Sequence, residues 1–150
     1  MQLHETVPII QQAIQLSIAP VFLLTGVAGL LGVITNRLAR IIDRARELEA
    51  RWKQMDADAI SSARLEMASL ERRRGLASWS ITCCTAAALL VCLVIVTLFL
   101  EEFVKTELNW LAAAQFVAAM VLLIGGLWTF LAEIYIATHT SRIDAARFAT

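Results

Sequence analysis

The residues whose types could support binding or transport share one face of the helix predicted for the first apolar segment. At about 100° per residue they fall within roughly 120° of one another. We call this set the polar stripe, and it consists of Gln11, Gln12, Gln15, Ala19, Phe22, Gly26, Gly29, Val33, Asn36, Arg37, Arg40 and Arg44. Apart from Phe22 and Val33 its members are small or polar, whereas the other faces of this helix are mostly large and apolar.

Two interpretations of the polar stripe stay open on sequence alone. Small residues let helix backbones approach, and amides hydrogen-bond across such contacts, with the arginines anchoring the membrane edge. Alternatively, stripes from several subunits surround a water-filled path lined by rings of like side chains. Arginine rings would then favour anions, although Asp43 and Glu47 could neutralise them through local pairs.

Glu133 is the one carboxylate within an otherwise apolar segment. A charge inside a membrane is expensive and is expected to face protein or water, with a partner. We predict a buried ion pair between Glu133 and Arg37 or Arg40, which should lie at a similar depth. A role for Glu133 in binding a proton or a cation is the alternative.

The chain shows no pattern for catalysis, a cofactor or a metal. Cys83, Cys84 and Cys92 all lie in one apolar segment, where small packing residues are expected, and His4 and His139 lie near opposite ends. There is no phosphate-binding glycine loop and no nucleophile with its base. We therefore expect no enzyme, no cofactor and no metal. The net charge of +0 gives no reason to expect nucleic acid as a partner.

The fold class predicted is an all-α integral membrane protein, with residues 1–150 forming a single membrane domain. The hydrophobic share of 59% sits in three segments, at about residues 13–35, 76–100 and 108–138. Each exceeds the roughly 20 residues that cross a bilayer core, and only helices satisfy their own backbone at that length. The mean hydropathy of +0.68 agrees with this reading. Trp79, Trp110 and Tyr135 suit the membrane interfaces.

Residues 37–74 are predicted to form a helical hairpin that extends the first two spans. Apolar residues recur there at steps of three and four, and Asp58 suits the N-cap of the return helix. The segment holds ten Lys and Arg residues, whereas the link at 101–107 holds only Lys105. The positive-inside rule then places the hairpin and the C-terminus in the cytoplasm and the N-terminus outside.

Three helices alone offer little room to enclose anything, so we expect a homo-oligomer. Our first hypothesis for function is a conduit for ions or small solutes that the first helix lines. The alternative is a non-transporting scaffold whose hairpin binds a cytoplasmic protein. The expected partners are the lipid bilayer, other copies of the chain and, for the scaffold, that protein.

The segment Asn36–Glu49, preceded by Ile18–Gly26, resembles a family of bacterial membrane proteins catalogued as domain of unknown function 2721. The family pattern has a proline-bearing first span that ends in Thr-Asn-Arg-Leu-x-Arg-Ile-x-Asp-Arg-x-Arg. Its closing Phe-Leu-x-Glu-Ile and Arg-Ile match Phe130–Ile134 and Arg142–Ile143. The resemblance implies a bacterial inner membrane protein with three spans, and it supplies no activity.

Overall fold

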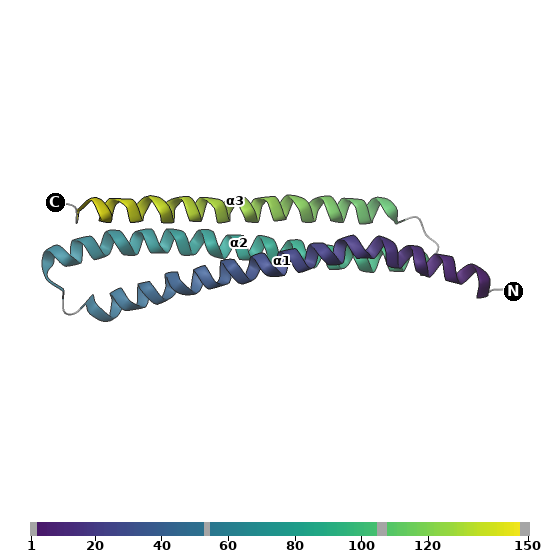
Figure 1. Cartoon of the computed structure of the whole chain (residues 1–150), viewed down its shortest axis with the longest axis horizontal. Helices are drawn as coiled ribbons and strands as arrows, with labels where there is room; N and C mark the ends of the chain where they lie inside the picture. Colours follow the sequence, from purple (N-terminus) through teal and green to yellow (C-terminus); the bar gives the residue numbers. More distant parts are fainter. Residues whose placement is uncertain (1–2, 53–54, 105–107, 148–150) are drawn as a thin grey trace. The chain divides into compact units, whose positions relative to one another are not determined.

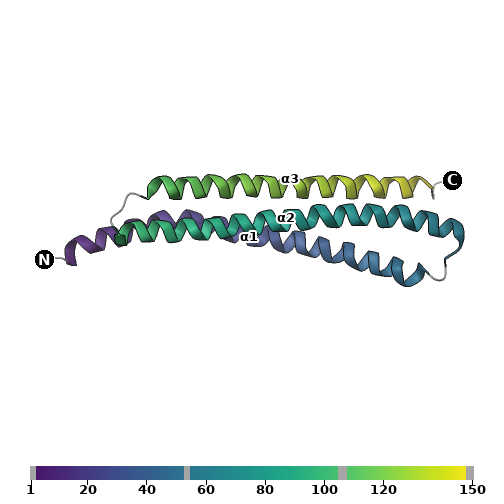
Figure 2. The same ribbon diagram turned by 180° about the vertical axis from the view of Figure 1, so that it is seen from behind.

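The computed structural model describes the backbone of residues 3–52, 55–104 and 108–147. Within these ranges it describes the side chains of 15, 18–52, 55–56, 59–101 and 108–138. Three helices make up the fold (Figures 1 and 2): α1 (Leu3–Arg51), α2 (Ala57–Val104) and α3 (Asn109–Arg147). The described part of the chain is therefore all-helical, as predicted.

Each of the three helices is long and apolar enough to cross a membrane. The candidate spans are Ile18–Arg51, Ala59–Glu101 and Asn109–Thr138, and the chain itself buries only 17%, 28% and 17% of their most apolar windows. Large apolar side chains such as Leu89, Val121 and Leu131 are exposed. Surfaces of this kind need lipid or other protein to cover them, so the chain is a multi-pass membrane protein.

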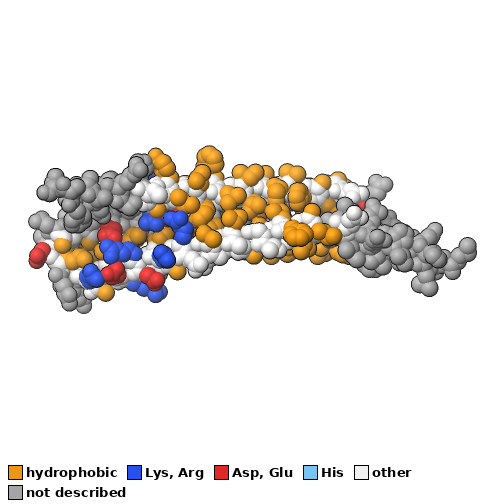
Figure 3. All heavy atoms as spheres, viewed as in Figure 1, with side chains coloured by type: hydrophobic (Ala, Val, Ile, Leu, Met, Phe, Trp, Pro, Cys, Tyr) orange, Lys and Arg blue, Asp and Glu red, His pale blue; other side chains and the backbone are white. Residues whose placement is uncertain are grey.

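The described residues form two compact units through which every helix passes. One unit combines residues 1–31 with 83–124, and the second combines 32–82 with 125–150. The second unit contains the hairpin, in which α1 runs into α2 (Figure 1). Its core is Ile41, Leu48, Ala63 and Leu70, against which Ala45, Trp52, Met55 and Met67 pack. Charged side chains gather over this hairpin on the face shown in Figure 3.

Buried positions recur every seven residues along each helix. In α1 they are Pro20, Val27, Ile34, Ile41 and Leu48. In α2 one row is Ala63, Leu70, Ala77, Cys84 and Val91, and a second is Ser80, Ala87 and Val94. In α3 they are Ala112, Ala119, Gly126 and Glu133. A repeat of seven is typical of coiled-coil packing with about 3.5 residues per turn. In α2 and α3 most of these residues are small, which allows close helix contact.

Two local expectations, for the N-cap of α2 and for the interfacial aromatic residues, can be compared with the structure. The N-cap of α2 is Asp56 and not Asp58, because the helix begins at Ala57 and the Ile60 amide donates to the Asp56 carbonyl at 2.9 Å. Asp56 and Asp58 are only two residues apart and have the same N-cap preference, so the sequence alone could not show which of them begins the helix. Trp79, Trp110 and Tyr135 are exposed, as residues that anchor in an interface must be.

Candidate functional site

Glu133 is brought into the helix interface by the seven-residue repeat of α3. It follows Ala112, Ala119 and Gly126 in the buried row, and its side chain is 0% exposed. The small residues that precede it let a neighbouring helix come close. Because the Glu133 carboxylate is buried, its stability depends on the groups that the other helices supply.

Two arginines from two different helices supply those groups. The Arg73 guanidinium of α2 donates to Oε1 of Glu133 from Nε at 3.1 Å and from Nη2 at 3.0 Å. The Nε of Arg37 in α1 lies 3.3 Å from Oε2, and the Arg37 guanidinium is 5.8 Å from the centre of the Phe130 ring. The Arg37 contact is an ion pair without hydrogen-bond geometry, since Oε2 has no hydrogen-bond partner among the described residues. Glu133 thus links α3 to both other helices.

The structure therefore brings Glu133 and Arg37 together, as predicted, and adds Arg73, which was not among the predicted partners. Arg40 makes no ion pair with Glu133 in the part of the chain that the structure describes. The signal for Arg73 is its helical phase, which can be recognised once the buried rows are known: it lies seven residues before Ser80, the first residue of the second buried row of α2. Arg72 and Arg74 have other helical phases and are exposed.

An open hollow lies beside this ion-pair cluster. It has a volume of about 570 Å³ and is lined by Val33, Asn36, Arg37, Arg40 and Arg73. Three guanidinium groups line the hollow and Glu133 balances one of them, so the cluster carries an excess of positive charge. Arg40 is exposed and has no ion-pair partner among the described residues.

The polar stripe faces outward from the chain. Its exposed members are Gln15, Ala19, Phe22, Gly26, Gly29, Val33, Asn36, Arg40 and Arg44. Arg37 is half-buried, and the side chains of Gln11 and Gln12 lie outside the described residues. A Cβ added at Gly26 or Gly29 would meet nothing within 4 Å. Packing inside the described chain therefore does not explain why these two residues are glycine.

Arg44, at the hairpin end of the polar stripe, is neutralised by two carboxylates. It donates to Glu47 at 2.9 Å and to Glu66 at 2.8 Å, and Arg51 also pairs with Glu47 at 2.6 Å. The hydrogen bond from Arg44 lowers the pKa of Glu47, with the charge of Arg51 as a further cause, so the pair is ionised at neutral pH. Asp43 makes no ion pair in the described ranges, so of the two neutralising residues expected, Glu47 fills that role.

The relationship of the chain to known proteins rests on a family model that matches residues 17–143. The family is described as a protein of unknown function, DUF2721. The chain belongs to DUF2721. The resemblance seen in the sequence is thereby confirmed, and the match includes Arg37, Arg73 and Glu133. No curated protein and no solved structure matches this DUF2721 chain.

Two further polar contacts join α2 to α3 in the DUF2721 chain, one in each unit. The Ser80 hydroxyl donates to the Gly126 carbonyl at 2.7 Å, and the Thr97 hydroxyl lies 3.0 Å from Oε1 of Gln115. Gln115 and Glu133, both on α3, thus each contact a polar side chain of α2. Side-chain hydrogen bonds of this kind stabilise helix pairs in membranes by about 0.6 kcal/mol on average.

Replacing Ser80 with alanine should lower the free energy of unfolding by about 0.6 kcal/mol and by no more than about 1.7 kcal/mol. The hydroxyl is fully buried, and its removal leaves the Gly126 carbonyl with one bond fewer. Denaturant titration in detergent micelles measures the change. Ser78→Ala is the matched control because Ser78 lies on the same helix and is exposed. Equal losses at the two positions would contradict the prediction.

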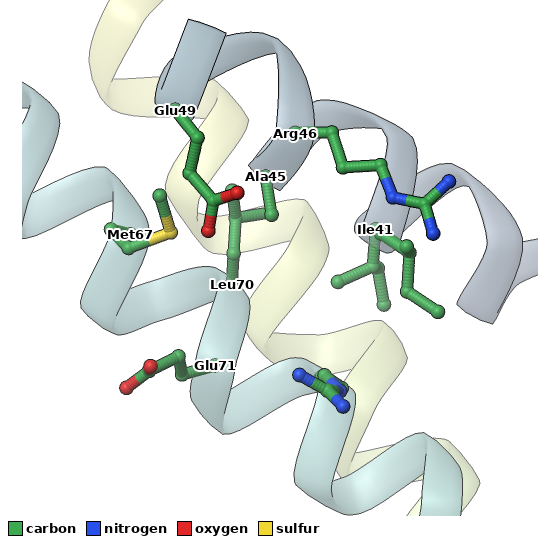
Figure 4. A pocket seen from close by; sticks show the side chains of 9 residues that line it. Ile41, Ala45, Arg46, Glu49, Met67, Leu70 and Glu71 are labelled. Carbon is green, nitrogen blue, oxygen red and sulfur yellow. The ribbon is translucent and has the colours of Figure 1, made fainter. Parts of the chain in front are cut away.

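A second hollow lies in the hairpin of this DUF2721 chain and has a volume of about 310 Å³. Figure 4 shows Arg46 and Glu49 on α1 and Met67, Leu70 and Glu71 on α2 around it. Its remaining lining residues are Ile41, Ile42, Ala45 and Arg74. The charges of its two acidic and two basic lining residues cancel, and its other lining residues are apolar. This hollow therefore has no preference for one sign of charge, in contrast to the hollow beside Glu133.

Proposed function

We propose that several copies of this chain assemble so that their polar stripes surround a conduit for ions or small solutes. The observation that carries the proposal is the outward exposure of the stripe. Val27, Ile34 and Ile41 on another face of α1 are buried within the chain, whereas Gln15, Gly26 and Asn36 face away from it.

The polarity of the exposed face supports assembly around a path. An amide that faces lipid has no hydrogen-bond partner there and is unfavourable, whereas in a helix interface or a water-filled path it is satisfied. Phe22 is 74% exposed and Val33 is 53% exposed on the same face. In a ring of subunits these two would form apolar constrictions, which is how some channels close by excluding water.

The charges on the stripe support a preference for anions. Arg44 is neutralised by Glu47 and Glu66, and Arg37 is shared with Glu133, so Arg40 is the described stripe arginine that keeps a free charge. Under the positive-inside rule this end of the path, the hairpin and the C-terminus face the cytoplasm of a bacterial inner membrane, with the N-terminus outside. The proposed function involves no catalysis and no cofactor.

Charge reversal at Arg40 tests the conduit directly. Liposomes containing the purified oligomer should pass anions in preference to cations, and Arg40→Glu should shift the reversal potential toward cation preference. Arg64→Glu is the matched control, because Arg64 is an exposed arginine of the hairpin away from the stripe. The conduit proposal would be wrong if liposomes containing intact oligomers were impermeable. It would also be wrong if Arg40→Glu and Arg64→Glu shifted the reversal potential equally.

A second pair of variants tests which face lines the path. Gly26→Phe adds a large side chain to the stripe where a Cβ meets nothing within 4 Å, so the chain itself should fold normally. Ala28→Phe adds the same side chain to an exposed position on another face of α1. Size-exclusion chromatography should show that both variants still form the oligomer. Gly26→Phe should then abolish most of the flux through the liposome membrane, whereas Ala28→Phe should reduce it little.

The scaffold is the second candidate, and the exposure of Leu65 favours it. Leu65 is 77% exposed on the α2 arm of the hairpin, where a partner protein could cover it. A scaffold predicts impermeable liposomes and a specific partner that Leu65→Ser no longer binds. The flux measurement therefore separates the two proposals.

A further inference from the structure

The hollow beside Glu133 has the composition of an oxyanion site. Its lining is one apolar residue, the Asn36 amide and the guanidinium groups of Arg37, Arg40 and Arg73. Among the described residues the lining contains no carboxylate, and Glu133 balances one of the three positive charges. Guanidinium groups bind phosphate with two parallel hydrogen bonds, and an amide can donate as well.

The arrangement of the three arginines is partly fixed before any ligand arrives. Glu133 holds Arg73 through two donors at 3.0 Å and 3.1 Å and keeps the Nε of Arg37 at 3.3 Å. These two guanidinium groups therefore lose little freedom on binding an anion. Arg40 is exposed and unpaired among the described residues, so it is the group with capacity for a new ion pair.

The position of the hollow along the chain indicates where such an anion would come from. Val33 belongs to the last turns of the first apolar segment, and the arginines Arg37 and Arg40 follow it directly. A membrane places its phosphate groups at this boundary, just outside the hydrocarbon core. Arginine at such a position contacts headgroups while its carbon chain stays in apolar surroundings.

We infer that the hollow lined by Asn36, Arg37, Arg40 and Arg73 binds a phosphate oxyanion, such as the headgroup of an anionic phospholipid. The site lies within one chain, so it needs neither an oligomer nor a conduit and goes beyond the function proposed above. Glu133 is a positioning residue for this site, since it orients two of the arginines and does not line the hollow itself.

The test uses the full-length protein purified in a neutral detergent, with binding measured by native mass spectrometry and by the shift in thermal unfolding. The probes are phosphatidylglycerol, phosphatidylcholine and inorganic phosphate. We expect phosphatidylglycerol to bind more tightly than phosphatidylcholine. Arg40→Gln should weaken phosphatidylglycerol binding roughly fivefold, as expected for one arginine near an anionic surface. Arg64→Gln removes the same charge outside the hollow and should have a much smaller effect.

Each outcome decides the inference. Binding of phosphatidylglycerol alone, weakened by Arg40→Gln and not by Arg64→Gln, supports the site with lipid as its source. If inorganic phosphate binds, and Arg40→Gln weakens its binding whereas Arg64→Gln does not, the result supports the site with a soluble phosphate as its ligand. Equal losses in the two variants, or no preference for phosphatidylglycerol and no phosphate binding, overturn it. Because binding is measured without flux, impermeable liposomes would leave this inference intact.

Discussion

Glu133→Leu is expected to destabilise the folded chain by about 3–5 kcal/mol, the typical loss when one partner of a buried ion pair is removed. The substitution leaves Arg73 and Arg37 without their counter-charge, and the side chain of Arg73 is only 22% exposed. Denaturant titration in detergent measures the change in the free energy of unfolding. Loss of monodisperse protein on size exclusion is the expected companion result.

Double mutants can rank the three arginines by the energy with which each is coupled to Glu133. Arg73 gives two hydrogen bonds and Arg37 gives one ion pair at 3.3 Å, whereas Arg40 makes no contact with Glu133 among the described residues. Combining Glu133→Leu with Arg73→Met should therefore be milder than Glu133→Leu alone. The coupling energy should be smaller with Arg37→Met and near zero with Arg40→Met, the matched control. Additive losses for all three pairs would contradict the ion-pair cluster.

The long helices of this fold could be predicted from the sequence because the bilayer leaves few alternatives. Apolar segments of sufficient length must become helices, and helix-period patterning without proline or glycine carries the first two through residues 37–74. The structure assigns unbroken helices over Leu3–Arg51 and Ala57–Val104 accordingly. Pro20 lies within α1 without ending it.

The faces that the helices bury could not be predicted in the same way. In a water-soluble helix the apolar face is the buried face, but in a membrane helix the exposed face is apolar too. Leu89 and Val121 are exposed, whereas Ala87 and Ala119 are buried, so the seven-residue period identifies the interface of α2 and α3 and hydrophobicity does not. The repeat of seven that places Arg73 beside Glu133 becomes visible only when the helices are compared.

The site illustrates the same limit. The requirement that a buried carboxylate has a partner led to Arg37, because the two residues lie at similar membrane depths. Depth alone could not distinguish Arg37 from Arg40, which lies one turn further along α1. Arg40 lines the hollow and makes no ion pair with Glu133 among the described residues. The polar stripe was visible on a helical wheel, but its exposure depends on how α1 packs within the chain.

The second large effect is expected at Ala119, where Ala119→Leu should destabilise the chain by about 1–3 kcal/mol through overpacking. Ala119 is 0% exposed in the buried row of α3, and its neighbour Ala118 is exposed. Ala118→Leu adds the same three carbons one residue away and should be nearly neutral for unfolding of the chain in detergent. Leucine has a high helix propensity, so a loss at Ala119 alone would be a packing effect. Equal losses at the two alanines would mean that the seven-residue repeat does not define the helix interface. The polar contacts of Ser80 and Glu133, which occupy the same repeat, would then need another explanation.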